Sequence, residues 1–333
     1  MGLIPDSILE EILKEYGINS PRISLIRHNE NITYKVTDLT IDHSYLFRVH
    51  YPITKNLEGL QHSKEGIICE LRLLQKISNE TGLLVQAPLQ NRSGLLTTEL
   101  NCIGDHTTYC SVVKWIDGRS LQKEDFSDRD LIYRLGVQIS LLHKFFKDYN
   151  KTPNDIIQSR PHYGRKKNEM MLKQIFRGVE KGLFRQYEYD IIVQTFELIN
   201  ARLFGNKEDP DAWGIIHGDL HMGNILVTEN RDIAFIDFGL FGYGHYLLDV
   251  AMGALNSTPQ TRELFLEGYF GNGTYSRDVL NIIEGFILLS IFGYYAFHME
   301  NKEVHPWIKE RMPLLCKVNC QPFLKGESIL YNF

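Results

Sequence analysis

Short apolar runs separated by polar turns fill residues 23–115 of the chain. They are rich in β-branched and aromatic residues, which favours strands over helices. Residues 63–77 depart from this pattern, because Ile67, Leu71 and Leu74 recur there at helical spacing. The expected strands cover residues 23–26, 32–37, 45–50, 95–100 and 109–115. The pattern therefore predicts an antiparallel five-stranded sheet with one accompanying helix.

The rest of the chain has mainly helical spacing. Ser127 suits an N-cap, and Leu131, Leu135, Leu142 and Phe146 mark a long core helix after it. Because 333 residues exceed the usual size of one core, we expect two lobes. The expected lobes are residues 1–114, which would bind nucleotide, and 119–333, joined by a hinge at 115–118. Further helices are expected at residues 1–16, 169–184, 188–204, 261–270, 279–298 and 307–315.

Polar groups stand at both ends of a predicted hairpin. Two β-branched runs, residues 225–227 and 233–236, flank the polar stretch 228–232 and predict a β-hairpin. Asp219 and Asn224 precede the hairpin and Asp237 follows it, so we expect two carboxylates and an amide to converge. Oxygen ligands suit Mg²⁺, and a separate carboxylate can take a proton from an attacking hydroxyl. The pattern indicates phosphoryl transfer.

The amino-acid sequence of this stretch resembles that of a known family. The run 217–221, His-Gly-Asp-Leu-His, followed by Asn224 and by Asp-Phe-Gly at 237–239, resembles the aminoglycoside phosphotransferase and choline kinase family. The resemblance implies an α+β, two-lobed protein-kinase-like fold and a kinase activity. It also implies that Asp219 is the catalytic base, that Asn224 and Asp237 hold Mg²⁺, and that His221 lies near the γ-phosphate.

Two residues of the first lobe are expected to form the phosphate-binding part of the nucleotide site. Arg48 stands in the third predicted strand, where the family usually has a lysine that reaches the α- and β-phosphates; arginine also suits phosphate. Glu70 falls on the core-facing stripe of the helix at residues 63–77. Because a carboxylate in that position needs a cation, we expect Glu70 to pair with Arg48.

Two other segments complete the expected nucleotide site. The turn at residues 27–33 has no glycine, but Asn29 and Asn31 tolerate left-handed backbone geometry and can donate amide groups to phosphate. A plain surface hairpin tip is the alternative. By resemblance, Trp115 and Ile116 at the hinge would line the pocket for the base of ATP or GTP.

Composition restricts the partners. Charged residues make up 23% of the chain and the net charge is −5, which gives no support for a nucleic-acid binder. Five cysteines at unpatterned spacings fit a reducing cytoplasm. The N-terminus has no signal pattern, and the apolar run 285–297 is shorter than a membrane span, so we expect a buried helix and no membrane partner.

Three hypotheses for the function follow. The favoured one is an ATP- or GTP-dependent, Mg²⁺-dependent phosphotransferase acting on a hydroxyl of a small molecule. A Ser/Thr protein kinase of the same family is the second, although the chain lacks an Ala-Pro-Glu element. A nucleotide-binding pseudokinase is the third, supported by the glycine-free turn and Arg48.

Three further features are expected to have structural roles. Asp249 would brace the catalytic loop or cap a helix, and His143 would be structural. Residues 161–165 would form a lid edge or a linker.

Overall fold

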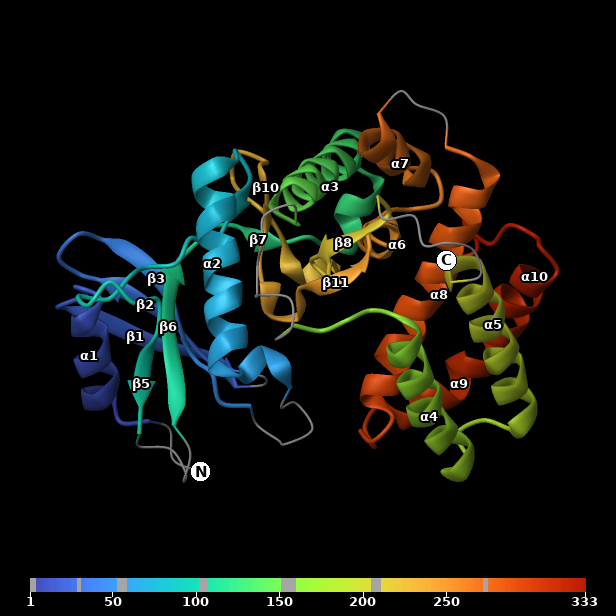
Figure 1. Cartoon of the computed structure of the whole chain (residues 1–333), viewed down its shortest axis with the longest axis horizontal. Coiled ribbons are helices and arrows are strands. Elements are labelled where there is room, and N and C mark those ends of the chain that lie inside the picture. Colours follow the sequence, from blue (N-terminus) through green and yellow to red (C-terminus); the bar gives the residue numbers. More distant parts are fainter. Residues whose placement is uncertain are drawn as a thin grey trace. The chain divides into compact units, whose positions relative to one another are not determined.

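The chain forms two compact units (Figure 1). The computed structural model describes residues 4–28, 31–52, 59–101, 107–150, 160–204, 211–271 and 275–333, so Asn29 and Cys102 lie outside the described residues. Unit 1 comprises Met1–Arg119, Asn154–Pro161 and Leu226–Leu240. Unit 2 comprises Ser120–Pro153, His162–Ile225 and Phe241–Phe333. The roles predicted for a first lobe, a hinge at 115–118 and a second lobe stay predictions.

Unit 1 contains the predicted antiparallel sheet. Its order is β1-β2-β3-β6-β5, with β1 at Pro21–His28, β2 at Ile32–Asp38, β3 at His43–Val49, β5 at Thr98–Leu100 and β6 at Thr108–Lys114. Phe47 and Val49 point to a core that they share with α1 (Asp6–Glu15). Leu46 packs on the other face with Ile67 and Leu71 of α2 (Lys64–Glu80). Side chains alternate along β3, so Arg48 shares the face covered by α2.

Helix α2 begins where the sequence predicts. The Ser63 hydroxyl accepts a hydrogen bond from the Gly66 amide at 3.0 Å, which caps the first turn. Figure 1 shows α1 and α2 on opposite sides of the sheet. This arrangement buries Glu70 at 3% exposure, on the stripe that packs against β3.

The predicted hairpin is present. Strand β9 (Ile225–Val227) neighbours β10 (Ile233–Phe235), and β10 pairs in parallel with β4 (Leu84–Val85). The polar turn closes because the Thr228 amide donates to the Asp232 carbonyl at 3.0 Å. Arg231 takes a positive φ of 65° in this turn. The hairpin joins the loop that carries Asn224 to the turn that carries Asp237.

Unit 2 is mainly helical, as predicted, and together with the sheet of unit 1 it gives the chain the predicted α+β composition. Its longest helices, α3 (Arg129–Asn150) and α8 (Arg277–His298), have 22 residues each. Glycines let α3 and α7 pack closely, since a Cβ on Gly136 or on Gly268 would lie 2.1 Å from a backbone oxygen of the other helix. The remaining elements are α4 (Arg165–Glu180), α5 (Gln186–Phe204), β8 (Trp213–Ile216), β11 (Gly242–His245), α6 (Leu247–Ala254), α7 (Arg262–Phe270), α9 (His305–Leu315) and α10 (Gln321–Leu324), with the short β7 (Arg119–Ser120) at the boundary of the units.

Two predicted helix starts are wrong. Asp128, rather than Ser127, caps α3, because its carboxylate accepts from the Leu131 amide at 3.1 Å. The Ser127 hydroxyl donates instead to the Glu124 carbonyl. Helix α4 begins at Arg165, four residues before the expected start, with Gly164 as its N-cap residue in an extended conformation.

The apolar run at residues 285–297 lies inside α8, as the sequence predicts. Among the described helices, α8 is the one whose length and composition would suffice to cross a membrane, and 56% of its most apolar 18-residue window is buried inside the protein. The four described cysteines, Cys69, Cys110, Cys316 and Cys320, are buried and form no disulfide with one another. Burial raises the pKa of Cys69 to about 11, so its thiol is neutral at physiological pH.

Candidate active site

A buried carboxylate braces the loop that carries Asp219. Asp249, in the first turn of α6, is fully buried and accepts from the His217 amide at 2.7 Å and from the Gly218 amide at 2.8 Å. Gly218 has a φ of 77°, a conformation that side chains disfavour. Two charge-assisted bonds to consecutive amides fix the direction in which the chain enters Asp219. Of the two roles predicted for Asp249, these contacts match the brace.

Two further side chains, the buried His143 and the partly buried Tyr269, hold the brace. His143 Nε2 lies 3.1 Å from Asp249 Oδ2, and His143 Nδ1 lies 2.8 Å from the Tyr269 hydroxyl. An ionised carboxylate can only accept, so Nε2 carries the proton and Nδ1 accepts from Tyr269. Burial, with the charge of Asp249, raises the pKa of Tyr269, which keeps this donor protonated. The predicted structural role of His143 is thus tied to the loop.

Asp219, Asn224 and His221 lie together on the loop. The Asn224 amide nitrogen donates to the Asp219 carbonyl at 3.0 Å and to Asp219 Oδ2 at 2.9 Å. Since this nitrogen is engaged, the amide oxygen of Asn224 is the atom that remains for a cation. His221 Nδ1 accepts from the Gly223 amide, and its Nε2 lies 3.6 Å from Asp219 Oδ2. The Asp219 side chain stays 32% exposed and can meet a substrate.

In unit 1, Arg48 and Glu70 form the predicted ion pair. Arg48 Nη1 lies 2.8 Å from Glu70 Oε1, and the two side chains are only 6% and 4% exposed. Burial alone would lower the pKa of Arg48, but the charge and hydrogen bond of Glu70, helped by Asp237, raise it. Within the described residues, Arg48 Nε and Nη2 are buried without a hydrogen-bond partner. Such groups cost free energy unless an anion satisfies them.

Asp237 lies in unit 1, in a left-handed backbone conformation with a φ of 60°. This region is uncommon for residues other than glycine and marks functional turns more often than chance. Arg27, at the end of β1, places Nη2 3.1 Å from Asp237 Oδ2. No pattern in the sequence predicts a contact between these residues, which lie 210 positions apart. Arg27 is therefore a site residue that sequence reasoning missed.

The two predicted metal ligands, Asp237 and Asn224, each offer an oxygen atom of the kind that a hard cation prefers. Asp237 offers a carboxylate that attracts a positive group, and Asn224 offers an amide oxygen. In the described part of the chain, no group of three or more His, Cys, Asp or Glu residues could hold a metal alone. The predicted convergence of Asp219, Asn224 and Asp237 stays a prediction, because these residues belong to different units.

The remaining predicted nucleotide contacts lie in unit 1. Trp115 is half-buried: its indole N–H donates to Asp117 Oδ1 at 3.0 Å, and the Lys35 ammonium lies 4.5 Å from its ring centre. Ile116 and Asn31 are also half-buried. Within the described residues, the Asn31 side-chain oxygen has no hydrogen-bond partner. The structure thus joins Arg48 to Glu70, but not these three residues to that pair.

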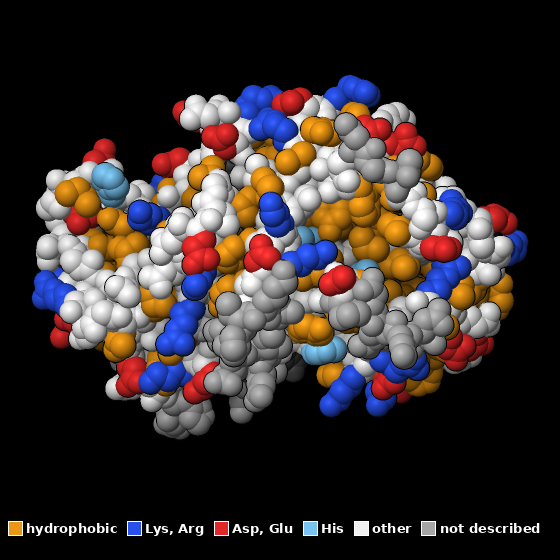
Figure 2. Space-filling model, turned by 45° about the horizontal axis from the view of Figure 1, so that its top comes forward, with side chains coloured by type: hydrophobic (Ala, Val, Ile, Leu, Met, Phe, Trp, Pro, Cys, Tyr) orange, Lys and Arg blue, Asp and Glu red, His pale blue; other side chains and the backbone are white. Residues whose placement is uncertain are grey.

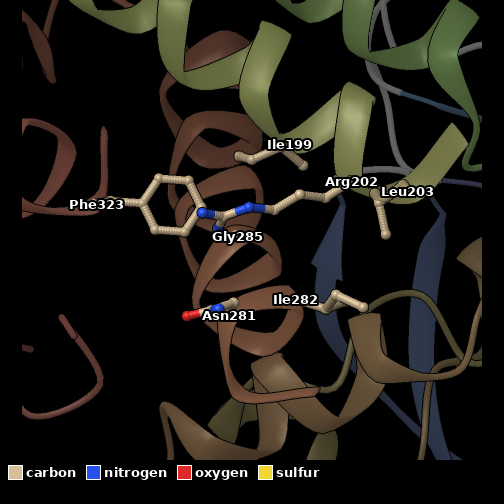
Figure 3. A pocket seen from close by; sticks show the side chains of 7 residues that line it. All are labelled: Ile199, Arg202, Leu203, Asn281, Ile282, Gly285 and Phe323. Carbon is tan, nitrogen blue, oxygen red and sulfur yellow. The ribbon is translucent and has the colours of Figure 1, made fainter. Parts of the chain in front are cut away.

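Two hollows in the described surface do not involve the predicted residues. One, in unit 2, lies between α5, α8 and α10, where Arg202 extends over Phe323 beside Gly285 (Figure 3). The other lies in unit 1 between α2 and residues 90–99. On the face shown in Figure 2, basic and acidic side chains are interspersed, with no continuous basic stripe.

Comparisons with known proteins confirm the predicted protein-kinase-like fold. The model of the phosphotransferase enzyme family matches residues 22–279. The structure of a microcompartment-associated aminopropanol kinase superposes with a TM-score of 0.74 at 20% identity, covering 97% of this chain and 98% of that one. An amicoumacin kinase bound to AMP-PNP, Ca²⁺ and amicoumacin gives 0.70 at 16% identity, with 98% and 97% covered. Choline kinase from Cryptosporidium parvum gives 0.67 at 14% identity, with 97% and 96% covered.

A curated relative matches a short part of the chain. An uncharacterized protein of Mycobacterium tuberculosis is 48% identical over 46 residues. The matched part is 14% of this chain and only 9% of that relative. The family assignment rests instead on the family model, which covers most of the chain.

Proposed function

Because the chain belongs to the phosphotransferase enzyme family, we propose that it transfers the γ-phosphoryl group of ATP or GTP to a hydroxyl of a small molecule. The observation that carries this proposal is the geometry of Asp219 and Asn224. The amide nitrogen of Asn224 holds one carboxylate oxygen of Asp219 at 2.9 Å, and Asp219 remains partly exposed. A carboxylate that is oriented and accessible is suited to act as a general base.

In the proposed reaction, the acceptor hydroxyl gives its proton to the Asp219 carboxylate. The hydroxyl oxygen forms a bond to the γ-phosphorus while the bond from that phosphorus to the β,γ-bridging oxygen breaks. The products are a phosphate monoester and a nucleoside diphosphate. Asp219 contributes orientation and proton acceptance, and the brace at Asp249 keeps its loop from moving.

Arg48 would bind the nucleotide phosphates. Its buried Nε and Nη2 groups have no partner within the described residues, and phosphate oxygens would satisfy both. Glu70 pairs with the third guanidinium nitrogen, Nη1, at 2.8 Å. Asp237 and Asn224 would hold Mg²⁺, which would neutralise phosphate charge in phosphoryl transfer. Asn31, Trp115 and Ile116 are the proposed nucleotide contacts, and His221 would contact the γ-phosphate.

The relatives support a small acceptor. The solved structures similar to this chain include kinases named for aminopropanol, choline and amicoumacin. AMP-PNP in the amicoumacin kinase structure supports ATP as the phosphoryl donor. We therefore place amino alcohols and amicoumacin-like compounds first among candidate acceptors.

The test measures metal-dependent consumption of ATP and of GTP against pools of amino alcohols, aminoglycosides, homoserine and sugars. The expected result is transfer to a member of one pool that disappears in an Asp219→Ala protein. Transfer to a protein extract, with none to its low-molecular-weight fraction, would favour the protein-kinase hypothesis. Nucleotide binding without transfer to any acceptor would favour a pseudokinase.

A further inference from the structure

Arg160 is a buried cation that donates hydrogen bonds to three main-chain carbonyls of unit 1, although the helices before and after it along the chain, α3 and α4, belong to unit 2. It is 3% exposed and precedes α4 by five positions. Its Nη1 donates to the Gly66 carbonyl at 3.1 Å, and its Nη2 donates to the carbonyls of Phe238 and Gly239. A guanidinium that is removed from water and spread over three main-chain carbonyls fixes each of them, because moving one would leave a buried donor unsatisfied.

The three carbonyls belong to two parts of the proposed nucleotide site. Phe238 and Gly239 directly follow Asp237, the proposed metal ligand. Gly66 lies in the first turn of α2, one helical turn before Glu70, which holds Arg48. Arg160 therefore fixes the spacing between the turn at Asp237 and the helix that supports Arg48.

The conformation of Asp237 explains why such support is needed. A φ of 60° is unfavourable for a residue with a side chain and persists only when surrounding contacts impose it. The Arg27 ion pair at 3.1 Å involves side chains that are 56% and 32% exposed, so solvent screens it. The buried contacts of Arg160 to the next two residues constrain the main chain at Asp237 more strongly.

We propose that Arg160 is a positioning residue that holds the main chain at Asp237–Gly239 against α2, and so sets the affinity for the metal–nucleotide complex. The proposal rests on the proposed function. An arginine is required because its planar fork reaches acceptors on two sides, which a lysine ammonium at the end of one flexible stem cannot do.

The test compares equilibrium binding of Mn²⁺ with AMP-PNP, followed by the electron paramagnetic resonance of free Mn²⁺. We expect Arg160→Lys and Arg160→Met to weaken binding by about tenfold or more, which corresponds to about 1.4 kcal/mol. Arg177→Met is the matched control, because Arg177 is 55% exposed and pairs with Glu300 on the surface. Urea unfolding of each protein, measured in parallel, separates affinity from stability.

The outcomes are distinct. If the wild-type protein does not bind Mn²⁺ with AMP-PNP, the proposed function itself fails. If it binds, and a folded Arg160→Lys or Arg160→Met protein binds within twofold of it, the positioning role is overturned whatever its urea midpoint. Failure of both variants to fold would assign Arg160 to the stability of unit 1 instead.

Discussion

Replacing Glu70 by glutamine is expected to lower the free energy of unfolding by about 3 kcal/mol, the lower end of the cost of breaking a buried ion pair. The Arg48 and Glu70 side chains are 6% and 4% exposed, and their atoms lie 2.8 Å apart. Arg48 would lose its charge partner, and within the described residues no acceptor meets its buried Nε and Nη2. Glutamine keeps the size and one acceptor, so the effect reports the charge.

The assay is urea unfolding followed by the fluorescence of Trp115, which lies in unit 1. Trp213 and Trp307, the other two tryptophans of the chain, are replaced by phenylalanine in every protein compared. The control is Glu80→Gln, on the same helix, because Glu80 pairs with Lys76 and both side chains are about half exposed. That change should cost less than about 0.5 kcal/mol.

A double variant separates stability from binding. Arg48→Met with Glu70→Leu removes both charges and should recover most of the lost stability, because apolar pairs of similar volume replace buried ion pairs well. The same protein should no longer bind nucleotide tightly. If Glu70→Gln and Glu80→Gln unfold at the same urea concentration, the buried pair does not contribute as argued.

Two other changes test the electrostatics and the brace. Burial, with the charges of Arg48 and His62, holds the pKa of His50 well below its usual range. Below about pH 6.5 the unfolded chain therefore binds a proton at His50 that the folded chain does not bind. The free energy of unfolding should then fall as the pH falls, by up to about 1.4 kcal/mol per pH unit. Urea midpoints measured between about pH 5 and 7 should show a shallower loss for His50→Asn than for the wild type, and equal slopes would contradict the assignment. Asp249→Asn should lower kcat by about 10–100-fold, because the new amide group would face one of the two loop amides, donor against donor. Its nucleotide affinity, measured by calorimetry, should stay within twofold of the wild type. An unchanged kcat would show that the brace does not act on Asp219.

The local parts of the fold were predictable because they depend on periodicity and caps. Alternation in β3 and helical spacing in α2 placed Arg48 and Glu70 on facing surfaces, and their ion pair followed. The β-branched runs around residues 228–232 likewise predicted the hairpin. In each case the residues that decide the structure lie close together in sequence or on one face of an element.

Contacts between distant segments were not predictable. Arg27 meets Asp237 across 210 positions, and Arg160 meets Phe238 across 78. Neither arginine lies in a periodic apolar pattern, so nothing in the sequence distinguishes it from a surface cation. The Tyr163 amide likewise donates to the Tyr243 carbonyl at 2.8 Å, a contact that the sequence did not predict. The lid edge or linker expected at residues 161–165 stays a prediction. Such contacts form only when segments far apart in the sequence fold against each other within one unit.

The measurement that tests the central claim most directly compares Asp219→Ala with the wild type for phosphoryl transfer and for binding of Mg²⁺ with AMP-PNP. Glu229→Ala is the control, since Glu229 is an exposed carboxylate in the turn of the same hairpin. If Asp219 is the base, transfer should fall by roughly 10²–10⁴-fold while binding changes little. Transfer at the wild-type rate by the Asp219→Ala protein would contradict the account.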